Sequence, residues 1–173
     1  MKQQSIALTF IPWIVLSCSS GKADFLTGAI IALALNIVIA RKMLLRGVVL
    51  ELGGTIFFAA MIFVGLLGQS TNIFIQHPNL CSNLAMAIIM LGSVAINKPF
   101  TGQYTNKGSK KLHMHLSSIW GILLLLAAFI SLGHVYLGIN DTVATIGTVA
   151  AIILGIKANE LYPKWFYERQ GHN

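Results

Sequence analysis

The sequence predicts an all-α fold, a polytopic membrane helix bundle with six transmembrane helices and both termini in the cytoplasm. Hydrophobic residues make up 55% of the 173-residue chain and charged residues only 10%. A soluble domain carries about a quarter charged residues, so this composition excludes one. The apolar runs also approach or exceed the roughly 18 to 20 residues that cross a hydrocarbon core, and basic residues gather at their ends.

The predicted spans form one integral membrane domain, residues 1–173. They cover residues 5–20, 24–40, 48–67, 79–96, 116–137 and 141–157, with a polar inner loop at 97–115. Pro12 predicts a kink in the first span, because a proline inside a helix removes a hydrogen bond. Asp24 and Asp141 suit the N-caps of the second and sixth spans, and Pro78 suits the start of the fourth.

The first apolar run has a second interpretation. A basic N-terminus, the run at 6–16 and Cys18 together resemble a short signal peptide that ends in a lipobox-like cysteine. Trp13 and Pro12 are unusual in such a segment, so a transmembrane helix is favoured. For Cys18 and Cys81, near the predicted outer face, a disulfide and a role as small apolar packing residues both stay open.

The basic residues set the predicted orientation. With a cytoplasmic N-terminus, only Lys22 lies outside. The other basic residues lie inside: Lys2, Arg41, Lys42, Arg46, Lys98, Lys107, Lys110, Lys111, Lys157, Lys164 and Arg169. This asymmetry predicts a multi-pass protein of the bacterial cytoplasmic (inner) membrane. The net charge of +7 then indicates anionic lipids at the cytoplasmic face as partners and no nucleic acid.

Two predicted helices carry small residues at steps of four. The stripes are Gly28, Ala32, Asn36 and Ala40 on the second span, and Gly147, Ala151, Gly155 and Asn159 on the sixth. Such stripes let helices approach closely, so we expect the tightest contact between these two spans. Glu51, one turn inside the third span, is expected to pair with Arg46, Lys42 or a loop lysine.

Polar side chains within the spans allow a transporter or channel. Asn36 must find a partner in hydrocarbon, either on a neighbouring helix or in a polar pore. A pore would converge on the candidate polar lining formed by Asn36, Asn83, Ser93, Thr145 and Thr148.

Residue types that bind metals gather near the outer face: His77, His134, Asp24, Asp141, Cys18 and Cys81. No two of them have ligand spacing on one helix, so no metal site is predicted. His113 and His134 lie about 31 Å apart on one helix, but no other span offers a histidine to complete haem ligation, so no cofactor is predicted. Catalytic residues are not predicted either, because paired carboxylates, a Ser/His/Asp spacing and a glycine-rich phosphate loop are all missing.

The inner loop carries a recognisable motif. Pro99, Phe100, Thr101, Gln103 and Tyr104 follow the order Pro-Phe-Thr-x-Gln-Tyr. This order resembles a signature of small uncharacterised bacterial integral membrane proteins. More loosely, the arrangement from Pro78 to Leu137, with Trp120 early in the following span, is similar to the intracellular septation protein A family. The resemblance implies an inner-membrane protein that acts in envelope maintenance or division through partners, with no catalytic residues.

The loop itself has two interpretations, an interfacial anchor or a specific docking surface. Pro99 ends the fourth helix, Phe100 and Tyr104 are expected at the membrane interface, and Thr101 and Gln103 are expected to face water or a partner. The lysines form the rest of the interaction surface: Lys98, Lys107, Lys110 and Lys111.

Three hypotheses follow. The first is a non-enzymatic protein that acts through lipid or membrane-protein partners, or as a homo-oligomer. The second is a small-solute or ion transporter or channel subunit. The third is a membrane enzyme or metal-binding protein, which requires His77, His134 and Asp141 to meet at the outer face.

Overall fold

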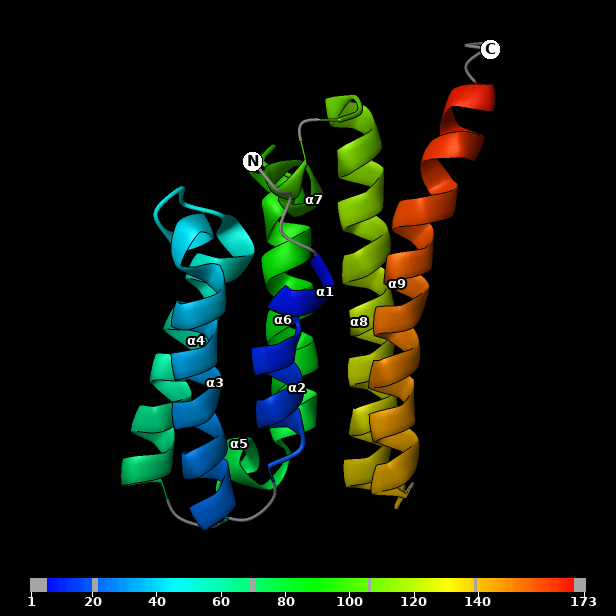
Figure 1. Cartoon of the computed structure of the whole chain (residues 1–173). Helices are drawn as coiled ribbons and strands as arrows, with labels where there is room; N and C mark the ends of the chain where they lie inside the picture. Colours follow the sequence, from blue (N-terminus) through cyan, green and yellow to red (C-terminus); the bar gives the residue numbers. More distant parts are fainter. Residues whose placement is uncertain (1–5, 20–21, 69–70, 106, 139, 170–173) are drawn as a thin grey trace.

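A computed structural model describes residues 6–19, 22–68, 71–105, 107–138 and 140–169, and this part of the chain is all-helical (Figure 1). Five helices are long and apolar enough to cross a membrane. They are α3 (Lys22–Leu44), α4 (Val49–Leu67), α6 (Pro78–Ala95), α8 (Lys110–Leu137) and α9 (Asp141–Arg169). The short helices are α1 (Ile6–Thr9), α2 (Ile11–Ser17), α5 (Ile73–Gln76) and α7 (Phe100–Tyr104).

The predicted first span is not one continuous helix. It forms α1 and α2, which Phe10 separates, and Pro12 lies in the first turn of α2, where a missing N–H costs nothing. At 1.5 Å per residue, the seven residues of α2 rise about 10 Å, too little to cross a membrane alone. Phe10, Trp13 and Leu16 are fully or almost fully buried, so α2 is a core element, packed on α3 and α6.

The small-residue stripes pack in a different way from the prediction. The stripe of α3 faces α2 and α4, and that of α9 faces α8, which lies between α6 and α9. Figure 1 shows α3 and α9 on opposite sides of the bundle. The predicted contact between them is therefore wrong, because each stripe is used by the nearest neighbour in sequence, Gly28 against Ser19 and Gly155 against Trp120.

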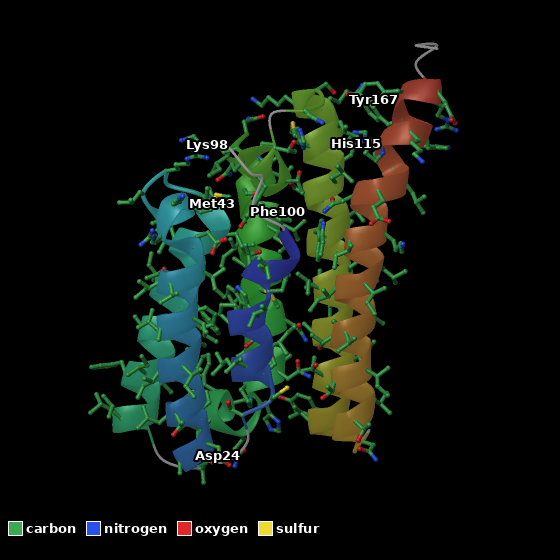
Figure 2. The ribbon with its side chains drawn as sticks, viewed as in Figure 1. Asp24, Met43, Lys98, Phe100, His115 and Tyr167 are labelled. Carbon is green, nitrogen blue, oxygen red and sulfur yellow. The ribbon has the colours of Figure 1, made fainter. Side chains whose placement is uncertain are left out.

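One end of the bundle carries α7, the turn between α3 and α4, and the last turns of α9. Figure 2 shows Met43, Lys98, His115 and Tyr167 there, and Asp24 at the opposite end. We call it the basic end. Here α8 and α9 extend beyond their predicted bounds, and their added turns pack on each other: Phe166 contacts the cluster of Leu112 and Leu116, and His115 Nδ1 lies 2.7 Å from the Tyr162 hydroxyl.

Candidate functional site

The Pro-Phe-Thr-x-Gln-Tyr motif folds into α7, where the sequence predicted a loop. Asn97 adopts a left-handed conformation (φ 58°) that ends α6 and turns the chain toward Pro99, the N-cap of α7. The Phe100 N–H then donates to Ser93 Oγ over 3.1 Å. The motif is therefore a folded unit at the basic end, tied back onto α6 (Figure 2).

Phe100 and Thr101 attach α7 to α8. Phe100 is fully buried and meets the Trp120 ring edge-on, with ring centroids 6.2 Å apart. The Thr101 hydroxyl lies 3.1 Å from both Ser117 Oγ and the His113 carbonyl oxygen. The expectation that Thr101 faces water or a partner, and that Phe100 and Tyr104 lie at the interface, is wrong because all three are buried in the bundle.

Gln103 joins α7 to the start of α4. Its Oε1 accepts the Val49 N–H over 2.7 Å, and its Nε2 donates to the Lys98 carbonyl oxygen over 2.7 Å. The first N–H groups of a helix lack partners within the helix, so this side chain supplies one for α4. Gln103 is half-buried. Gln103 on α7 therefore caps the first turn of α4, a role that sequence spacing could not reveal.

Tyr104 completes the docking of α7 by donating its hydroxyl to Glu51 Oε1 over 2.6 Å. Glu51 is fully buried, and its other oxygen, Oε2, has no hydrogen-bond partner among the described residues. The expected ion pair of Glu51 with Arg46, Lys42 or a loop lysine is thus replaced by a phenol. The hydroxyl reaches the carboxyl because α7 folds inward and does not lie on the surface.

The stability of the protein is expected to fall at high pH because of Tyr104. Burial, and secondarily the neighbouring Glu51, raise the pKa of Tyr104 above its ordinary value. The unfolded chain loses the phenol proton of Tyr104 near pH 10, while the folded chain keeps it. Below pH 10 both states hold this proton, so Tyr104 does not make the free energy of unfolding depend on pH there. Above it, this free energy should drop by about 1.4 kcal/mol per pH unit. Detergent unfolding from pH 9 to 11 tests this, and Tyr104→Phe should show a shallower decline; equal slopes would contradict it.

A basic pocket of about 570 Å³ opens beside α7. Arg46, Lys98 and Lys110 line it with exposed side chains, and the buried His113 forms part of its wall. Its lining contains neither aspartate nor glutamate. Lys107 and Lys111 are exposed on neighbouring turns but do not line it. The pocket is therefore a site of concentrated positive charge at one end of a membrane bundle.

Sequence reasoning missed Arg46 and His113 as parts of this pocket. Arg46 was assigned to a short connection and His113 to a helix end. A usable signal existed, since the positive-inside count already put Arg46, Lys98 and Lys110 on the same side of the membrane. What the sequence lacked was the fold of α7, which brings the three connections to one point.

The candidate lining of a pore does not converge. Asn36 Nδ2 donates to Thr55 Oγ1 (2.9 Å) and so links α3 to α4. Asn83 Nδ2 donates to Thr148 Oγ1 (2.8 Å), linking α6 to α9. Ser93 lies at the basic end, bonded to Phe100, whereas Thr145 lies beside a cavity at the opposite end, one turn of α9 from Thr148.

Among the described residues, no group of three His, Cys, Asp or Glu could hold a metal. His77 and Cys18 line the same cavity, whereas the side chains of His134 and Asp141 lie outside the described part. Cys18 and Cys81 are free cysteines, so the structure does not contain the disulfide that was one of the two alternatives left open for them.

Comparison with known proteins adds no family. No family model, curated protein or solved structure matches the chain. The resemblance of the α7 motif to small bacterial membrane proteins, and to the septation family, therefore stays a prediction.

Proposed function

We propose that this protein is a non-enzymatic protein of the bacterial inner membrane that binds an anionic lipid headgroup in its basic pocket and acts in envelope maintenance or division. The observation that carries the proposal is the convergence of Arg46, Lys98 and Lys110 around a pocket with no acidic lining residue. Basic pockets between helices at the cytoplasmic side are typical sites for phosphate-containing lipid headgroups. The motif resemblance supports the envelope role.

The surroundings of the pocket favour a headgroup over a free anion. The pocket lies where α3 and α6 end and α4 and α8 begin, and in the proposed orientation these helix termini face the lipid headgroups. Neighbouring lysines at 107 and 111 add to the local potential. Each basic residue near an anionic surface contributes about 1 kcal/mol. A lipid phosphate is already held at this depth by its acyl chains, whereas a soluble anion loses translational entropy when it is localised there.

The proposed orientation puts the basic end in the cytoplasm, together with both termini. The basic residues in the α3–α4 turn, the α6–α8 connection and the end of α9 support it through the positive-inside rule. In this arrangement the chain from Ile6 to Ser17 would pass from the basic end towards the opposite end as the two short helices α1 and α2. The transporter hypothesis ranks second, because Asn36 and Asn83 each pair with a side chain on a neighbouring helix.

Lipid retention tests the proposal. We expect purified protein in mixed micelles to retain phosphatidylglycerol in preference to phosphatidylcholine, measured by native mass spectrometry. The triple variant Arg46→Gln, Lys98→Gln and Lys110→Gln should weaken this binding by about 100-fold, from about 1 kcal/mol per basic residue.

A charge-matched triple variant separates the pocket from the overall charge. Arg41→Gln, Lys42→Gln and Lys164→Gln remove the same charge from exposed positions outside the pocket and should leave the bound phosphatidylglycerol in place. If both triple variants lost bound phosphatidylglycerol equally, the binding would depend on the overall positive charge and not on the pocket. No preference for phosphatidylglycerol in the unaltered protein would overturn the proposal.

A further inference from the structure

A second cavity, of about 340 Å³, lies at the end opposite the basic pocket. It forms where α2, α5, α6, α8 and α9 meet. Its polar lining consists of hydroxyls and amides: Ser17, Ser19, Gln76, Asn79, Ser131 and Thr145. Of the lining residues, only His77 and Cys18 are able to carry a charge. The volume falls in the lower range of small-molecule sites.

Asn79 connects this cavity to a buried polar network. Asn79 Oδ1 accepts from Asn83 Nδ2 (3.1 Å) and from Thr148 Oγ1 (3.0 Å), and Asn83 Nδ2 also donates to Thr148 Oγ1 (2.8 Å). The three side chains come from α6 and α9 and are all more than nine-tenths buried. They hold the amide of Asn79 in a fixed position in the cavity wall.

Four polar side-chain atoms on the described parts of α2 and α6 are left without a hydrogen-bond partner. Asn79 Nδ2, Asn83 Oδ1 and the hydroxyls of Ser17 and Ser82 are buried and have no partner among the described residues. Each such atom costs about 1–3 kcal/mol, and most buried polar atoms in folded proteins are satisfied. Two of these residues, Ser17 and Asn79, line the cavity. A bound molecule that offers both donors and acceptors would offset this cost.

We propose that this cavity binds a small uncharged polyhydroxy compound that enters from the end of the bundle opposite the basic end. A hydroxyl group is donor and acceptor at once, as are the serine, threonine and amide groups that line the site. A charged ligand would lose its hydration without an acidic, lysine or arginine counter-charge in the lining. At about 30 Å³ for each water-sized group, the cavity suits a molecule of roughly ten non-hydrogen atoms. The inference is independent of lipid binding at the basic end.

Cys18 provides a reporter, because it is exposed and lines the cavity. We would measure the rate at which N-ethylmaleimide labels Cys18 in the full-length Cys81→Ala protein in nanodiscs. Saturating sorbitol should slow labelling about tenfold, since a ligand in such a pocket is largely buried and covers its walls. Gluconate, which has the same carbon skeleton with a carboxylate, should not protect.

Two serines on α8 give a matched control. Ser131 and Ser118 both donate to the carbonyl oxygen four residues earlier, but only Ser131 lines the cavity. Sorbitol protection should disappear in Ser131→Leu and in the smaller change Asn79→Ala, and persist in Ser118→Leu, with all variants first shown to be monodisperse. Absence of protection, equal protection by gluconate, or protection that survives in Ser131→Leu would overturn the proposal and leave a cavity that holds only water.

Discussion

Replacing Gly155 by alanine is expected to destabilise the bundle by about 1–3 kcal/mol, the usual cost of overpacking a filled core. A Cβ at this position would lie 2.6 Å from three ring atoms of Trp120. The indole cannot give way, because it is fully buried, stacks on Phe10 with ring centroids 4.7 Å apart and meets Phe100 on its edge. The added methyl group must therefore push α9 away from α8. Thermal unfolding in detergent measures the effect.

Gly92 supplies the control, since a Cβ there would have no heavy atom within 4 Å. Gly92→Ala in α6 should leave stability unchanged or raise it by up to about 1 kcal/mol, the helix propensity gain of alanine over glycine. The comparison separates close packing from a general effect of removing glycine. If Gly155→Ala unfolds at the same temperature as Gly92→Ala, the contact between Gly155 and Trp120 does not control the packing of α8 and α9.

The spans of the fold were predictable because their signal is local. An apolar run of about 20 residues needs no knowledge of its neighbours to be recognised. Helix pairing was not predictable in the same way, because a small-residue stripe marks a close approach without naming the partner. The stripes at Gly28 and Gly155 were correctly expected to pack closely, yet each faces the adjacent hairpin partner. The kink predicted from Pro12 is present as a break at Phe10, two residues before the proline, but hydropathy alone did not show that the two resulting helices are too short to be one span.

The site was predictable in composition and not in geometry. Sequence spacing identified the motif and the lysines around it, and the positive-inside count gathered them on one side of the membrane. The sequence could not show that α7 turns inward, because the position of α7 depends on long-range partners such as Ser117 and Glu51. Polar motif residues were therefore expected to face water, when their hydrogen bonds instead go to neighbouring helices. A lone deep glutamate such as Glu51 was the available signal that a polar partner had to come to it.

Removing the Tyr104 hydroxyl is expected to release α7 from the bundle. Tyr104→Phe deletes the donor to Glu51 Oε1, and Oε2 has no described partner to compensate. A buried polar group that loses its partner costs about 1–3 kcal/mol, and more when it is charged. We therefore expect a drop of at least that size in the free energy of unfolding, with faster hydrogen exchange over residues 100–104. Tyr136→Phe, at an exposed position on α8, should change neither.

A double-mutant cycle distinguishes the pair from the separate side chains. Glu51→Leu alone leaves the phenol without its carboxyl acceptor, but Glu51→Leu combined with Tyr104→Phe removes both polar groups from a buried place. Replacing both partners of a buried polar pair by apolar groups of similar shape is often nearly neutral. The double variant should therefore be more stable than the sum of the two single changes predicts, by about 1 kcal/mol or more. Strict additivity would show that α7 is held by its contacts to α8, through Phe100 and Thr101, and that the Glu51–Tyr104 hydrogen bond is incidental.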